Sequence, residues 1–153
     1  MRKNVVLPVV AASVAALTMS LTSQPATAVP LRPCGPPAAT KGHGTKGTPF
    51  TLKSMYDDDG PQEGVVVVGE EFEILTQVSG QVWDLVFTYN RKPFFTGKDT
   101  SKPSGIREVR MTRYLGGKSH VAAHAKNEKT GEVIDGAVDL PVAPPGCGRG
   151  GED

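Results

Sequence analysis

Residues 119–142, SHVAAHAKNEKTGEVIDGAVDLPV, decide the fold class, because they predict two strands joined by a short polar turn. The turn, residues 128–131, ends in Gly131, and glycine supplies the positive φ that short hairpin loops need. With this turn, Ala125 lies opposite Ile134. This register places six apolar residues on one face of the predicted hairpin: Val121, Ala123, Ala125, Ile134, Val138 and Leu140. A shift of one residue would exchange the two faces, so this pattern specifies the register.

The opposite face of the hairpin carries two histidines and two aspartates. The predicted register places His124 opposite Asp135 and His120 opposite Asp139. Opposite charges that face each other across two strands attract weakly, so each pair is expected to be an exposed ion pair when its imidazole is protonated. On a strand the two histidines are about 13 Å apart, which is too far to share a metal ion. The sequence therefore predicts no metal site on this face.

Alternating apolar and polar residues recur upstream, between clusters of turn residues. The expected strands, besides the two of the hairpin, are residues 50–56, 70–78, 82–89, 92–95 and 106–114. In the last of these, Val109 and Met111 are expected to point inward, and residues 96–105 are expected to form a polar loop. About seven strands at intervals of about 8–12 residues, with no helical period, are typical of an antiparallel β-sandwich.

Two runs resemble immunoglobulin-like domains of secreted bacterial proteins. They are VVVVGEEFEILTQV, residues 65–78, and YLGGKSHVAAHAKNEKTGEVI, residues 114–134. Trp83 falls where the third strand of such domains often carries its core tryptophan. This resemblance implies an immunoglobulin-like antiparallel sandwich of about seven strands. The second run is also similar to lipid-recognition domains of the same fold, which implies a carrier with an apolar ligand between the sheets.

Residues 1–28 have the pattern of a secretory signal peptide, so the protein is expected to be secreted. The segment has a basic start, an apolar run over residues 5–19 and an Ala-Thr-Ala ending at Ala28. The apolar run is shorter than the roughly 20 residues that a membrane span requires. Two of the 17 Lys and Arg residues lie in this segment, and the other 15 stand against 16 acidic residues. The net charge therefore gives no support to nucleic-acid binding.

The remaining chain divides into a Pro/Gly-rich leader at 29–48, the sandwich at 49–142 and a flexible tail at 143–153. Cys34 in the leader and Cys147 in the tail are the two cysteines of the chain. In an oxidising compartment such a pair most simply forms one disulfide, which would strap the leader across the sandwich of a monomer. The alternative is a bridge between two chains that makes a covalent dimer. Neither cysteine has a second cysteine or histidine at the spacing of a zinc site, so no structural zinc is expected.

Acidic and basic residues are segregated along the chain. Residues 57–84 hold eight acids and no base, whereas residues 91–118 hold eight bases and two acids. One explanation is a basic face for an acidic polymer or a membrane surface. The other, which we favour, is pairing between the second and fifth strands, which would bring Glu71 and Glu73 beside Arg110 and its neighbours.

Phe94 and Phe95 are a second candidate contact point. Adjacent residues of a strand point to opposite faces, so one of the two rings is expected to be exposed and available to a partner. A hydrolase would need a nucleophile or a bound water beside a His–Asp pair, and Ser119 and Thr88 are the hydroxyl groups in plausible reach.

No motif in the sequence identifies a substrate, a reaction or a cofactor. The sequence therefore predicts a non-catalytic binding module for an unknown protein or cell-surface partner. Its surface is expected to lie on the outer face around the two His–Asp pairs or at Phe94 and Phe95. A carrier of a small apolar ligand, with room left by small residues such as Ala123, Ala125 and Gly136, is the alternative, and a hydrolase that uses a His–Asp pair is a second one.

Overall fold

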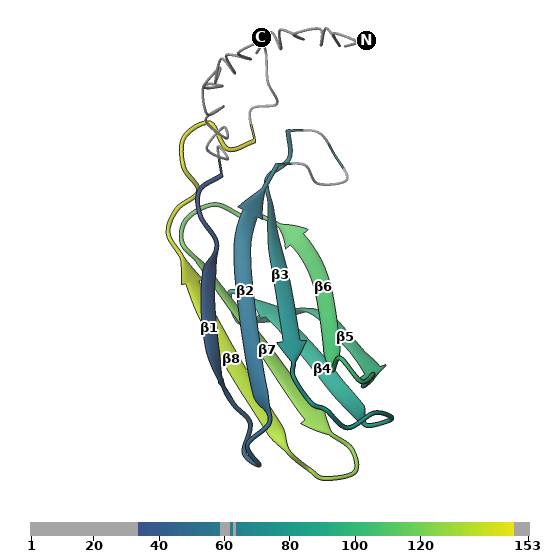
Figure 1. Ribbon diagram of the computed structural model, residues 1–153. Helices are drawn as coiled ribbons and strands as arrows, with labels where there is room; N and C mark the ends of the chain where they lie inside the picture. The colour runs from purple at the N-terminus through teal and green to yellow at the C-terminus, as the bar shows by residue number, and fades with distance from the viewer. Residues whose placement is uncertain (1–33, 59–61, 63, 149–153) are drawn as a thin grey trace, which may run out of the picture. The chain divides into compact units, whose positions relative to one another are not determined.

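The computed structural model describes residues 34–58, 62 and 64–148, and the regular structure in this part of the chain is all β (Figure 1). The eight strands are β1 (Ala38–His43), β2 (Pro49–Asp57), β3 (Val67–Ile74), β4 (Val82–Tyr89), β5 (Lys92–Thr100), β6 (Ile106–Arg113), β7 (Ser119–Asn127) and β8 (Val133–Leu140). They form two antiparallel sheets in the orders β1-β2-β3-β6 and β5-β4-β7-β8. The predicted all-β antiparallel sandwich is confirmed. The predicted signal peptide, residues 1–28, lies outside the described residues.

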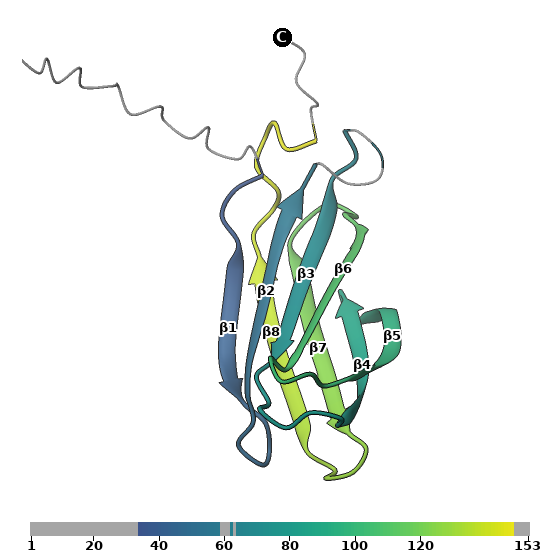
Figure 2. The ribbon, with the colours of Figure 1, turned by 45° about the vertical axis from the view of Figure 1, so that its right-hand side comes forward.

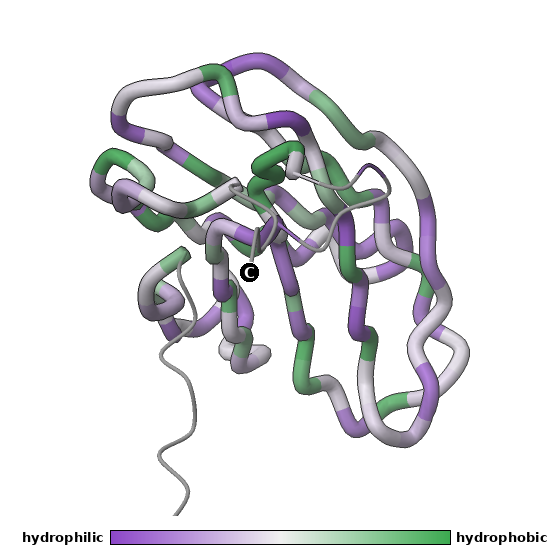
Figure 3. The backbone as a smooth tube through the Cα atoms, turned by 90° about the horizontal axis from the view of Figure 1, so that it is seen from above, coloured by the Kyte–Doolittle hydropathy of each residue, from purple (hydrophilic) through white to green (hydrophobic). Residues whose placement is uncertain are grey.

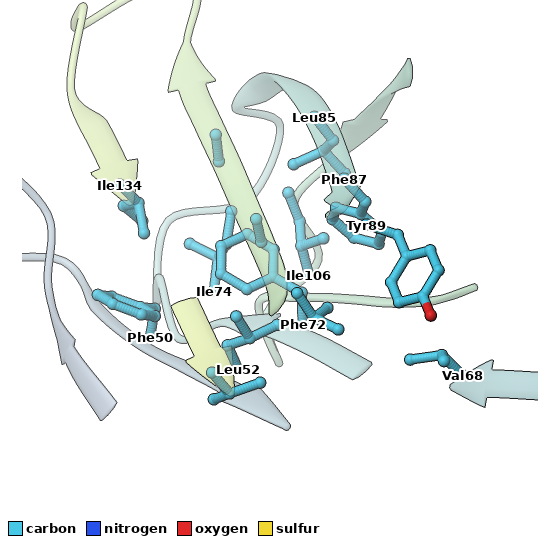
Figure 4. Packing of buried hydrophobic residues seen from close by; sticks show 14 of the residues in the cluster. Phe50, Leu52, Val68, Phe72, Ile74, Leu85, Phe87, Tyr89, Ile106 and Ile134 are labelled. Carbon is cyan, nitrogen blue, oxygen red and sulfur yellow. The ribbon is translucent and has the colours of Figure 1, made fainter. Parts of the chain in front are cut away.

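The core lies between the two sheets, where β2, β3, β4 and β7 direct every second side chain inward. Along the backbone, hydrophobic residues are interspersed with hydrophilic ones (Figure 3). Phe72 of β3 is near its centre, with ring centroids 6.0 Å from Phe50 and 5.9 Å from Phe87 (Figure 4). Trp83, on β4, is fully buried, as its position in the alternating run 82–89 predicts. This shared apolar layer is what holds the two sheets together.

The strand β1 lies within the Pro/Gly-rich leader 29–48, where the sequence predicts no strand. It pairs antiparallel with β2 and forms one edge of the first sheet. Its inward positions are small residues (Ala38, Thr40 and Gly42), so its sequence lacks the apolar alternation that marks a strand. The ring of Phe50 on the neighbouring strand β2 leaves no room for a side chain at Gly42, because a Cβ there would lie 2.8 Å from the ring.

The strand β5 is longer than the short segment 92–95 that the sequence predicts. Residues 96–100, which were expected to be a loop, continue its pairing with β4 (Figure 2). This edge strand is mostly exposed and polar, so the sequence shows no buried face. The register shifts between Phe87 and Thr88, which marks a β-bulge.

The strand β6 has the opposite orientation to the one predicted. Val109 and Met111 are 38% and 52% exposed on the outer face. Ile106 pairs with Ile74 and is buried, so the residues at even spacing from it, Glu108 and Arg110, take the inner side. Because β6 is an edge strand, these long polar side chains can reach solvent around its rim.

The segregated charges pair within the first sheet, as the favoured explanation requires. Arg107 Nε lies 3.1 Å from Glu71 Oε1 and 3.8 Å from Glu73 Oε1. The predicted partner was Arg110, which lies opposite Glu70 in the ladder. The hydrogen bond from Arg107 holds the pKa of Glu71 below its ordinary value. These exposed pairs help to set the register and contribute little stability.

Cys34 and Cys147 form a disulfide within the chain, with Cα atoms 4.6 Å apart and a sequence separation of 113 residues. Cys34 precedes β1, and Cys147 follows β8. The bond therefore fixes the start of the edge strand β1 to the chain beyond the last strand. Between Cys34 and β2 the leader forms β1, at the edge of the first sheet.

The space beside Gly136 is filled by Phe50. A Cβ at Gly136 would lie 2.7 Å from the Phe50 ring. We therefore expect G136A to destabilise the fold by about 1–3 kcal/mol through overpacking. Urea denaturation of G136A beside G69A tests this, because a Cβ at Gly69 has its nearest neighbour at 3.8 Å and needs no rearrangement. Equal stability of the two variants would contradict the packing described here.

Candidate functional site

The outer face of β4, β7 and β8 carries the residues that the sequence singles out. The β7–β8 turn sets its register, because Asn127 Oδ1 accepts hydrogen bonds from the N–H groups of Lys129 and Thr130 at 3.0 and 2.9 Å. Gly131, with a φ of 68°, closes the turn. The ladder then pairs Ala125 with Ile134 and Val121 with Val138, as predicted.

Both predicted His–Asp pairs are present on this face. His120 Nδ1 lies 2.7 Å from Asp139 Oδ1, and His124 Nδ1 lies 2.8 Å from Asp135 Oδ1. The histidine side chains are 44% exposed, and the aspartates are more exposed still. Ion pairs this exposed contribute little to stability. The two pairs do place four polar side chains side by side on the paired strands β7 and β8.

A shallow depression of about 250 Å³ lies beside the His124–Asp135 pair. Its floor is made of small side chains, Ala122 on β7 and Ala137 on β8, which lie opposite each other in the ladder. The complete lining is Val86, Thr88, Ala122, Ala123, His124, Asp135, Gly136 and Ala137. The His120–Asp139 pair stands on the other side of the two alanines, since each of its residues is two positions along the same strand.

A second hollow, of about 440 Å³, continues from the His120–Asp139 pair to the β4–β5 turn. Its lining residues are Asn90, Arg91, His120 and Asp139. Asn90 and Arg91 have φ values of 50° and 67°, the left-handed region. For a residue such as Arg91 this backbone conformation costs about 1–2 kcal/mol relative to glycine. We call the two hollows and the two His–Asp pairs together the outer strip.

The two hydroxyl groups considered as nucleophiles lie in different surroundings. Ser119 is buried and its Oγ lies 2.9 and 3.1 Å from the hydroxyl groups of Tyr56 and Tyr89. It therefore points into the interior, on the opposite side of the sheet from the histidines. Thr88 lies on the outer face, and its Oγ1 donates a long hydrogen bond of 3.5 Å to the carbonyl of Ala122.

Neither Phe94 nor Phe95 has the fully exposed ring that strand alternation predicts for one of the two. Both rings are half-buried and pack against Phe87, at centroid distances of 6.3 and 5.2 Å. The β-bulge is the reason, because it inserts Phe94 as an extra residue and interrupts the alternation. Arg110 covers the Phe95 ring at 4.1 Å from its centroid. These aromatics close one side of the core and leave only part of each ring at the surface.

Glu70 is a buried acid that the sequence reasoning missed. It is 1% exposed, and neither carboxyl oxygen has a hydrogen-bond partner. Burial away from water raises its pKa to about 8. The sequence did carry the signal, since Glu70 is two residues before the inward-pointing Phe72 and shares its face.

The outer face of the other sheet has a smaller apolar depression of about 180 Å³, beside Gly69 and between Met55 and Met111. Among the residues that the structure describes, no three His, Cys, Asp or Glu side chains are grouped so that they could hold a metal ion. The described segments contain no helix long and apolar enough to cross a membrane.

Comparison of the chain with models of protein families, with curated proteins and with solved structures found no match. The class that the described residues define is an all-β antiparallel sandwich of eight strands with one disulfide.

Proposed function

We propose that the protein is a non-catalytic binding module of immunoglobulin type, secreted and monomeric. The strand order supports the immunoglobulin assignment. The strands β2, β3 and β6 correspond to A, B and E of such domains, and β5, β4, β7 and β8 correspond to C′, C, F and G. The strand β1 is then an addition at the edge beside A. Secretion rests on the pattern of residues 1–28, which precede the described part of the chain.

The observation that carries the proposal is the depression over Ala122 and Ala137 in the outer strip. Its floor is apolar and its walls hold fixed donors and acceptors on His124 and Asp135. This combination suits recognition, because apolar contact supplies affinity and a few placed polar groups supply specificity. All four residues lie on paired strands, so little order has to be gained when a partner binds.

The partner that fits this surface is a protein exposed outside the cell. The depression is too open to enclose a small molecule, whereas one apolar side chain of a protein segment can rest on the two alanines. The exposed His–Asp pairs then offer hydrogen bonds to the backbone of that segment.

Filling the depression tests this proposal. In A137W an indole occupies the floor, so binding of labelled protein to cells and secreted proteins of the producing organism should fall at least tenfold, as expected at the centre of an interface. The matched control is T51W, an outer-face position on β2 of the other sheet, which should bind like the wild type. Equal binding by A137W, or no binding by the wild type, would contradict the proposal.

A further inference from the structure

The β4–β5 turn places an arginine where its backbone favours glycine. Asn90 and Arg91 both have positive φ, the conformation of a two-residue type I′ hairpin turn. Asparagine is common at the first position and glycine at the second. Asn90 therefore fits its place, while Arg91 carries a strain that glycine would relieve. Such strain, where it persists, often marks a functional position.

The turn is fixed to the neighbouring strand β7, so Arg91 has a defined place on the outer strip. The N–H of Asn90 donates to the carbonyl of His120 at 2.8 Å, and the N–H of His120 donates to Asn90 Oδ1 at 2.9 Å. Arg91 therefore stands at the rim of the hollow that it shares with Asn90, His120 and Asp139.

The charges around this hollow leave Arg91 available. The carboxylate of Asp139 is already engaged by His120 Nδ1 at 2.7 Å. Arg91 is exposed, and no ion pair or hydrogen bond within the described residues engages its guanidinium. A guanidinium presents parallel N–H donors that match the paired oxygens of an oxyanion.

We propose that this hollow is a subsite for an anionic group of the partner, a carboxylate or a phosphate, and that Arg91 binds it. The inference rests on the proposed function, because the subsite adjoins the depression over Ala122 and Ala137 and extends the same outer strip. It adds a chemical requirement to that function, since the partner must carry an acidic group next to the apolar side chain that rests on the alanines.

The anion site is tested directly by NMR titration of the labelled full-length protein with sodium acetate, sodium phosphate and, for ionic strength, sodium chloride. Acetate or phosphate should produce saturable shifts at the Arg91 side-chain N–H and at the His120 amide, and chloride should not. The anion whose shifts saturate at the lower concentration identifies the chemistry of the acidic group. Linear shifts with all three salts would overturn the proposal.

The variant R91G separates a binding role from a structural one. Glycine relieves the left-handed strain, so R91G should unfold at a higher denaturant concentration than the wild type while it loses the saturable shifts. The variant K92A, which removes the neighbouring charge, should keep them. Shifts retained in R91G would overturn the proposal.

Binding to the producing organism distinguishes failure of the subsite from failure of the proposed function. If the subsite is correct, R91G should bind at least tenfold more weakly than the wild type. If R91G binds as strongly as the wild type while A137W loses binding, the subsite is overturned and the proposed function stands. Wild-type binding by A137W would overturn the proposed function, and the anion titration would then decide on the subsite alone.

Discussion

The variant E70Q is expected to remove a fall in stability of about 5 kcal/mol that the wild-type protein shows as the pH rises from 4.5 to about 8. In the folded protein Glu70 keeps its proton up to pH about 8, whereas the unfolded chain releases it near the ordinary value of 4.5. Between these values only the folded state holds the proton. The contribution of Glu70 to stability is therefore greatest below pH 4.5, falls by about 1.4 kcal/mol per pH unit and stops falling above pH 8.

Urea denaturation at pH 5, 6, 7 and 8 measures this effect as the difference between wild type and E70Q. The matched control is E71Q, which removes the neighbouring carboxyl on the outer face of the same strand and should keep the wild-type fall. A wild-type curve parallel to that of E70Q would contradict the burial of an unpartnered carboxyl. It would mean that Arg110, which lies opposite Glu70 in the ladder, leaves the Phe95 ring and pairs with it.

Removing the disulfide is expected to cost about 4.7 kcal/mol. The bond between Cys34 and Cys147 closes almost the whole described chain into a loop, and the chain-entropy estimate for a loop of this length is close to that figure. The double variant C34S/C147S therefore lowers the free energy of unfolding, which urea denaturation without reductant measures. Wild-type protein with added reductant should match the double variant. A loss below about 1 kcal/mol would contradict this account of the bond.

The hairpin of β7 and β8 was predictable because its sequence contains two independent constraints that agree. The period of two places Val121, Ile134 and Val138 on one face, and the Asn127–Gly131 turn favours the register that this face requires. The His–Asp pairs follow from that register alone. The two His–Asp pairs were therefore predictable, because the strands that carry them, β7 and β8, are consecutive in the sequence.

The edge strands were not predictable in the same way, since their structure depends on neighbours distant in sequence. The strand β1 has no apolar face and exists because β2 offers an unpaired edge. The orientation of Phe94 and Phe95 follows from a bulge opposite Phe87, which no local pattern marks. Arg91 was counted only as one of eight bases, because its left-handed backbone is a property of the folded turn.

Site-specific photo-cross-linking tests the central claim, that the outer strip is the binding surface, most directly. A benzophenone amino acid is placed at Ala137 and, in a separate variant, at Thr51 on the outer face of the other sheet, and both proteins are irradiated with the producing organism. The account predicts a discrete cross-linked product from position 137, reduced in a variant that also carries R91G, and none from position 51. A product from position 51 with none from position 137 would contradict it.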